Sequence, residues 1–208
     1  MHIELTEMLR CPEPHREEFL VLSTGEMSGR MVRTGIVGCP VCQKEYEIVD
    51  GVVYFGRREM RDERRVTTAH PSAHPSSLIS HPDAQTLQAL LDLSGPGGYV
   101  VLLGLACSYA AGLATLMGGI HFIGVNAPEG VEELPVLSLL ACATKIPLRD
   151  SMARGVVVGD ESSSAPWLTE ARRVLLPGRR LVVENETARP DGVTQLATGQ
   201  GLFVGEKK

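Results

Sequence analysis

The pattern of hydrophobic and polar residues changes character along the chain. In the first quarter, polar and apolar residues alternate, and the pair Asp50-Gly51 separates two such stretches. Alternation around an Asp-Gly pair is typical of a β-hairpin. Strands are expected at residues 19–22, 31–37, 45–49 and 52–55, after a short helix over residues 3–9. Residues 1–56 therefore predict a small β-rich unit.

From residue 83 onward, short apolar blocks alternate with stretches of helical periodicity. Strands are expected at 99–103, 121–125, 155–159 and 180–184, with helices at 84–93, between the first two strands, and at about 165–175. Alternating strands and helices predict a mainly parallel, doubly wound sheet with helices on both faces. The last residues leave room for one more strand or a hairpin near 201–205. Residues 83–208 therefore predict an α/β domain.

The segment between these two units, residues 57–82, has a different composition. Arginines and acidic residues are followed by a stretch rich in Ser, Pro and His with few apolar side chains. That composition is typical of a linker.

Composition and charge narrow the function classes. The chain has 208 residues, 43% of them hydrophobic and 22% charged, as in a globular protein. A net charge of -5 argues against a general nucleic-acid binder, which normally has a basic excess. The first residues show no charged leader followed by an apolar run, so a cytoplasmic protein is expected.

Residues 97–128 are apolar enough to raise the question of a membrane span. Glycines interrupt the stretch repeatedly and divide it into short blocks that resemble buried parallel strands. Flanking Lys, Arg and Trp anchors are missing. No membrane span is therefore expected.

Four residues have the types and spacing of a zinc site. Cys11 and His15 form one close pair, and Cys39 and Cys42 form the second. Zinc prefers four sulfur and nitrogen ligands, and ligands two to four residues apart can reach one ion from a single turn. Four protein ligands leave no position for an activated water, so the predicted site is structural. A redox Cys-x-x-Cys usually begins a helix, whereas Cys39 follows a predicted strand.

Residues 1–56 resemble a known family of zinc-binding proteins. The similarity is carried by residues 5–12 (LTEMLRCP), 39–42 (CPVC) and 46–52 (YEIVDGV). These segments resemble the small activator subunits of tRNA and release-factor methyltransferases. The resemblance implies a zinc-ribbon-like module; His15 stands where a second cysteine is common.

Residues 87 to about 185 resemble a class I S-adenosylmethionine-dependent methyltransferase domain. The matching segments are 146–151 (IPLRDS) with 155–158 (GVVV), and 168–181 (LTEARRVLLPGRRL). The first is similar to the turn and fourth strand of that family, and the second to its following helix and fifth strand. The resemblance implies a Rossmann-like domain and an S-adenosylmethionine site.

The positions that hold the cofactor in that family differ here. Only Gly104 of the glycine-rich turn is kept, while Ala106 and Ser108 stand at the other glycine positions. Asn126 replaces the carboxylate that would hold the ribose. Asp160, after the fourth strand, is a weak candidate for the catalytic side.

Two functions remain open from the sequence. The first is a non-catalytic methyltransferase-like protein that acts as an accessory, scaffold or partner-binding subunit. The second is an active methyltransferase in which Gly104, Ala106, Ser108 and Asn126 line a divergent cofactor pocket. The apolar stretch 97–128 and the lack of a substrate-binding insertion suggest a protein partner or self-association. Cys107 and Cys142 are expected to be buried small apolar residues.

Overall fold

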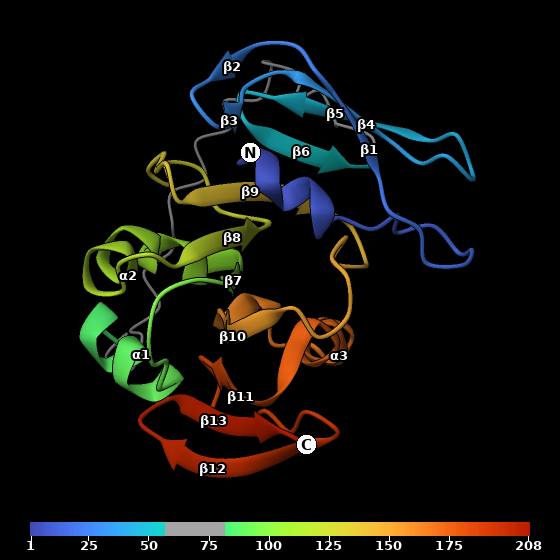
Figure 1. Ribbon diagram of the computed structural model, residues 1–208. Helices are drawn as coiled ribbons and strands as arrows, with labels where there is room; N and C mark the ends of the chain where they lie inside the picture. Colours follow the sequence, from blue (N-terminus) through green and yellow to red (C-terminus); the bar gives the residue numbers. More distant parts are fainter. Residues whose placement is uncertain (57–81) are drawn as a thin grey trace, which may run out of the picture.

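The computed structural model describes residues 1–56 and 82–208 (Figure 1). The predicted linker 57–82 lies, except for Pro82, outside the described residues. Within the described part, eleven strands form one sheet in the order β1-β4-β5-β6-β9-β8-β7-β10-β11-β13-β12, and β2 and β3 form a separate pair.

The N-terminal unit is built mainly from strands. A short 3-10 helix, η1, spans Ile3–Glu7. The strands are β1 (Val21–Thr24), β2 (Met27–Ser28), β3 (Met31–Val32), β4 (Gly35–Gly38), β5 (Glu45–Val49) and β6 (Val52–Phe55). The hairpin of β5 and β6 turns at Asp50 and Gly51, both of which have positive φ. The predicted strand 31–37 divides into β3 and β4, because the chain bends between Val32 and Gly35.

The second unit alternates strands and helices. Its helices are α1 (Ala84–Leu91), α2 (Ala110–Leu116) and α3 (Ala165–Val174), with 3-10 turns η2 (Gly104–Tyr109) and η3 (Asp160–Ser162). Its strands are β7 (Tyr99–Leu103), β8 (His121–Val125), β9 (Leu137–Cys142), β10 (Ala153–Val158), β11 (Leu175–Val183), β12 (Val193–Gly199) and β13 (Leu202–Lys207). The C-terminal hairpin is β12 and β13, which pair antiparallel.

The order of the central strands defines a doubly wound fold. From β7 the chain proceeds outward through β8 to β9, then returns to the other side of β7 for β10 and β11, all parallel. The order in which the chain adds strands therefore reverses between β7 and β10. Doubly wound sheets bind their ligands beyond the carboxyl ends of the strands at such a switch point. The predicted Rossmann-like α/β class is confirmed.

The two faces of this sheet carry different helices. Alternate residues of β7 point to opposite sides: Val100 and Leu102 pack in the core under α1 and α2, whereas Val101 and Leu103 pack in the core under α3. Figure 1 shows α1 and α2 on one side of the sheet and α3 on the other. This alternation explains the apolar stretch 97–128, in which the buried strands β7 and β8 flank η2 and α2. No helix among the described residues is long and apolar enough to cross a membrane.

The N-terminal unit joins the second unit through a direct strand pairing. β6 lies parallel to β9, with Val52 opposite Leu139 and Phe55 opposite Cys142. Buried residues of both units, among them Leu5, Ile48 and Val156, belong to one hydrophobic cluster. The two predicted units thus share one sheet and one core.

Candidate metal centre and cofactor turn

The structure brings together the four predicted zinc ligands. Cys11 and His15 belong to the segment between η1 and β1, and Cys39 and Cys42 lie in the turn between β4 and β5. That turn is closed by main-chain hydrogen bonds from Cys39 N to Lys44 O (2.9 Å) and from Gln43 N to Cys39 O (2.9 Å). The ligands are therefore held at the end of the strands that the sequence pattern predicts.

The distances among the four ligand atoms fit one tetrahedral ion. All of them lie within 4.8 Å of one another. Cys11 Sγ is 3.7 Å from Cys42 Sγ, and His15 Nε2 is 3.2 Å from Cys11 Sγ and 3.5 Å from Cys39 Sγ. Zinc–sulfur bonds of about 2.3 Å place two sulfurs of a tetrahedron about 3.8 Å apart. Three thiols and one imidazole at these distances suit Zn²⁺.

The surroundings shift the pKa values of two of the thiols in opposite directions. Burial raises the pKa of Cys39, but the backbone amides of Cys42 and Val41 and the neighbouring thiols favour its thiolate more strongly, and its pKa falls to about 7. Burial raises the pKa of Cys11 to about 11. Without a metal, a proton would remain on Cys11 at neutral pH, and binding of a cation would release it.

Tyr46 supports the site from the core side. Its hydroxyl lies 3.6 Å from Cys11 Sγ and donates to Glu13 Oε1 at 3.4 Å. Glu13 also forms an ion pair with Lys44 at 2.7 Å. Lys44 lies in the turn that supplies Cys39 and Cys42, and Glu13 lies between Cys11 and His15. Their ion pair therefore links the two segments that supply the candidate ligands.

The predicted cofactor turn follows the carboxyl end of β7, next to the point where the strand order reverses. Gly104 has φ +60°, a left-handed conformation that favours glycine. The chain then enters η2 without an intervening loop, so that Ala106 is buried and Ser108 is exposed. Gly104, Ala106 and Ser108 thus lie within one compact turn.

A carboxylate of the same chain occupies this turn. Glu161 Oε1, from η3 after β10, accepts a hydrogen bond from Leu105 N at 2.6 Å, and Ser162 Oγ donates to it at 3.2 Å. A Cβ atom added at Gly104 would collide with this carboxylate. Sequence reasoning did not single out Glu161, because nothing local connects it with a turn 56 residues earlier.

Asn126 is also engaged within the chain. It follows β8 in a left-handed conformation, and its Oδ1 accepts a hydrogen bond from Cys142 N at 2.8 Å. The amide therefore joins the ends of β8 and β9. Asp160 is exposed at the start of η3. Glu161 Oε1 and Asn126 Oδ1 thus each accept a hydrogen bond from a main-chain amide of the protein.

The two other cysteines lie apart from the metal ligands. Cys107 is buried, and its thiol donates to Leu102 O at 3.3 Å. Cys142 is only partly exposed at the end of β9. Burial raises the pKa of each to about 12, so both are thiols at neutral pH.

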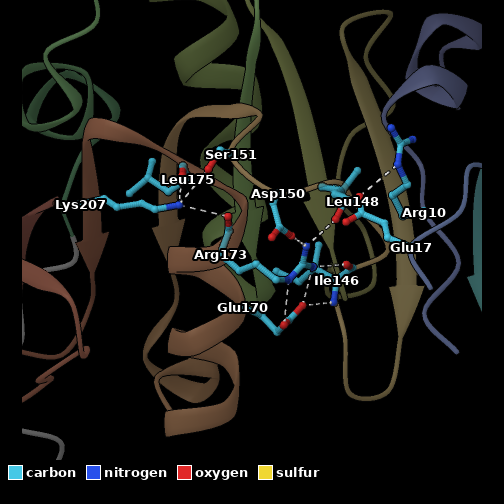
Figure 2. Close-up of polar contacts among 10 residues, drawn as sticks. All are labelled: Arg10, Glu17, Ile146, Leu148, Asp150, Ser151, Glu170, Arg173, Leu175 and Lys207. Carbon is cyan, nitrogen blue, oxygen red and sulfur yellow. Dashed lines mark hydrogen bonds and ion pairs between the residues drawn. The ribbon is translucent and has the colours of Figure 1, made fainter. Parts of the chain in front are cut away.

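An arginine of α3 holds the loop that contacts the segment with the candidate ligands Cys11 and His15 (Figure 2). Arg173 forms two hydrogen bonds with Glu170, at 3.0 and 2.7 Å, and one with Asp150 at 2.6 Å. Its guanidinium also donates to the carbonyls of Ile146 (2.6 Å) and Leu148 (2.7 Å). All these partners lie in the loop before β10 or on α3 itself.

The same loop contacts the chain just before Cys11. Leu9 forms an antiparallel bridge with Leu148, and Arg10 N donates to Pro147 O at 2.9 Å. Arg10 also pairs with Glu17 at 3.2 Å, within the segment that contains Cys11 and His15 (Figure 2). A continuous set of contacts therefore leads from α3 to the first metal ligand.

Comparisons with known proteins give likeness only in structure. No protein-family model matches the chain, and no curated protein matches it. Solved structures similar to it are class I S-adenosylmethionine methyltransferases. One is the Haloferax volcanii complex between the Trm112 methyltransferase activator and a methyltransferase, with 24% identity, a TM-score of 0.39, and coverage of 48% of this chain and 50% of that one.

Two further structures match a larger share of the chain. A geranyl diphosphate methyltransferase in complex with SAM has 13% identity and a TM-score of 0.47 over 60% of this chain and 84% of that one. The antibiotic-resistance methyltransferase Kmr has 14% identity and a TM-score of 0.42 over 61% and 93%. In the first three matches, the chain covers only 50%, 42% and 41% of the other protein. The described part of the chain has a Rossmann-like, doubly wound sheet.

Proposed function

We propose that this chain is a zinc-binding, methyltransferase-like protein without methyl-transfer activity, which acts as an accessory or partner-binding subunit. The observation that carries this proposal is the Glu161 carboxylate on the turn after β7. It takes the backbone amide and the space beside Gly104 that a cofactor would need.

Electrostatics and hydrogen bonding both support this proposal. An S-adenosyl cofactor carries an amino-acid carboxylate, and a second carboxylate near the same amide would repel it. Hydrogen bonds to a charged acceptor are about twice as strong as neutral ones, so the ligand would have to displace a strong contact. The bond from Cys142 N to Asn126 Oδ1 adds a second occupied group at the end of β8.

The zinc site serves architecture in this proposal. Cys11, His15, Cys39 and Cys42 would fill the coordination of one Zn²⁺ and leave no position for an activated water. The metal would fix the turn between β4 and β5 to the segment that precedes β1. Residues 1–56 would form a zinc-ribbon-like activator module, fused to a methyltransferase-like domain over residues 83–208.

The N-terminal unit also offers a surface for a partner. Val21 of β1 and Ile36 of β4 are exposed on the same face of the sheet, and Phe19 and Val41 are more than half exposed nearby. β1 is an edge strand, so its outer side is unpaired within the described sheet. A protein partner or a second copy of the chain would cover these side chains. Light scattering of the purified chain, alone and as Val21→Asp, separates self-association from a requirement for another protein.

The second candidate is an active methyltransferase with a divergent cofactor loop. Gly104 keeps the positive φ of a close-approach turn, and the Glu161 side chain is exposed, so a ligand that displaced it would release it into solvent. Ala106 adds little bulk to the turn. The ribose hydroxyls would then be held by the neutral amide of Asn126 in place of a carboxylate.

Calorimetric titration with S-adenosylmethionine and S-adenosylhomocysteine distinguishes the two candidates. We expect no binding by the zinc-loaded wild-type chain at millimolar ligand. Glu161→Ala, which frees the Leu105 amide and removes the charge, is expected to gain measurable binding, and Glu161→Gln, which keeps the volume, to gain less. Glu206→Gln on β13 is the matched control. Micromolar binding by the wild-type chain would establish the enzyme candidate instead.

A further inference from the structure

A second group of metal-binding side chains lies at the opposite edge of the sheet from the cofactor turn. His2 precedes η1, Glu4 lies within η1, and His121 begins β8. One ligand atom from each of the three lies within 4.8 Å of the others. The imidazole rings of His2 and His121 have centroids 4.8 Å apart, and His2 Nδ1 is 3.9 Å from Glu4 Oε2.

Main-chain contacts fix the two histidines independently of any metal. His2 N donates to the hydroxyl of the buried Ser138 at 2.9 Å, and His2 forms a bridge with Met31. His121 pairs with Tyr99 of β7, and its N–H donates to Gly98 O at 3.1 Å. Two imidazoles from separate parts of the fold are therefore held side by side.

The third side chain is oriented by an arginine. Arg30 pairs with Glu4 through Oε1, while Oε2 faces His2. Metal-binding carboxylates are commonly held in this way, with one oxygen on the ion and a hydrogen-bonding partner fixing the group.

We propose that His2, Glu4 and His121 form a second metal site that binds a divalent zinc ion more weakly than the cysteine cluster. Two imidazoles and a carboxylate suit borderline ions such as Zn²⁺, and three protein ligands leave a position for water. The site adjoins a cavity of about 600 Å³ lined by His2, Arg30 and Glu133, which gives an ion a route from solvent. An ion here would join the start of the N-terminal unit to β8.

The experiment uses the full chain with its cysteine cluster already loaded with one zinc. Calorimetric titration with Zn²⁺ is expected to show one further equivalent. His121→Ala is expected to lower the affinity for that equivalent at least about tenfold, and Glu4→Gln, which keeps the size of the side chain, about tenfold. Co²⁺ added in place of the second zinc is expected to give weak visible bands without thiolate charge-transfer absorption.

Two controls keep the proposal open to refutation. A variant in which His70, His74 and His81 of the Ser-, Pro- and His-rich segment are changed to alanine should retain the second equivalent, because the proposed site consists of His2, Glu4 and His121. Circular dichroism and retention of the first zinc should show that His121→Ala is folded. Absence of a further equivalent in the wild-type chain, or an equivalent that survives both His121→Ala and Glu4→Gln, would overturn the proposal. Neither result bears on binding of S-adenosylmethionine.

Discussion

At the scale of single residues, the zinc ligands were the most predictable part of the candidate site. Their types and spacing point to one ion before any fold is known, and the structure gathers all four. Glu161 could not be predicted in the same way, because its role depends on β7 and β10 ending side by side. Asn126 was identified by position, but its bond to Cys142 depends on β9, which the hydrophobic pattern did not reveal.

Tyr46→Phe tests whether the residue behind the cysteine cluster supports the metal. The change removes the hydroxyl beside Cys11 Sγ and keeps the ring that packs on Phe55. Since residues that orient metal ligands typically contribute a factor of about 10 to 100 in affinity, we expect zinc binding to weaken by roughly tenfold. Competition with a chelator measures the change. Tyr54→Phe is the matched control, and an equal loss there would contradict a specific role for Tyr46.

At the scale of elements, the strands with clear alternation or continuous apolar runs were predicted well. β5, β6, β7 and β8 have the expected bounds. β9 was missed, because its residues follow a proline and are recognisable as a strand only through pairing with β6 and β8. β11 begins five residues before its prediction, since Pro177 and Gly178 interrupt the apolar pattern where the register with β10 shifts.

The contacts of Arg173 lead to a prediction about α3 and the loop before β10. Arg173 and Glu170 side chains are only 18% and 14% exposed. Arg173→Ala removes the cation that pairs with Glu170 and donates to two carbonyls, and Glu170 keeps the bond from Ile146 N. Breaking a buried ion pair of this kind costs about 3–5 kcal/mol. Arg173→Lys is expected to lose nearly as much, because an ammonium cannot reproduce the planar fork.

Chemical denaturation of the zinc-loaded chain measures these losses. Arg189→Ala is a suitable control, because that side chain is exposed and donates only to nearby carbonyls. A loss below about 1 kcal/mol for Arg173→Ala, as for surface ion pairs, would contradict the structural role assigned to this residue.

At the scale of the whole molecule, the sequence divided the chain into two units, whereas the structure connects them by one sheet. The division rests on local composition, and the connection rests on the pairing of β6 with β9, whose partners, such as Val52 and Leu139, are 87 residues apart. Long-range pairing of this kind leaves no signal in a local pattern.

Removal of the first zinc tests how far the two units fold independently. A chelator strong enough to empty the cysteine cluster is expected to abolish amide protection in residues 1–56, since so small a unit depends on its metal. The environment of Trp167, a partly buried residue of α3 that packs against the core, is expected to persist. Hydrogen exchange and tryptophan fluorescence on the same sample report the two units. Simultaneous loss of both signals would indicate that the shared sheet unfolds as one unit.

The pairing of β6 with β9 also bears on how this chain avoids aggregation. Without residues 1–56, β9 would be the outer strand of the parallel sheet, with Leu139, Leu140 and Ala141 along an unpaired edge. Such an edge is a template for pairing with other chains. With residues 1–56 in place, this side of the sheet ends at the four-residue strand β1. The other side ends at β12 in either case. Residues 1–56 therefore protect the edge of the parallel sheet, because they supply its covering strand within the same polypeptide.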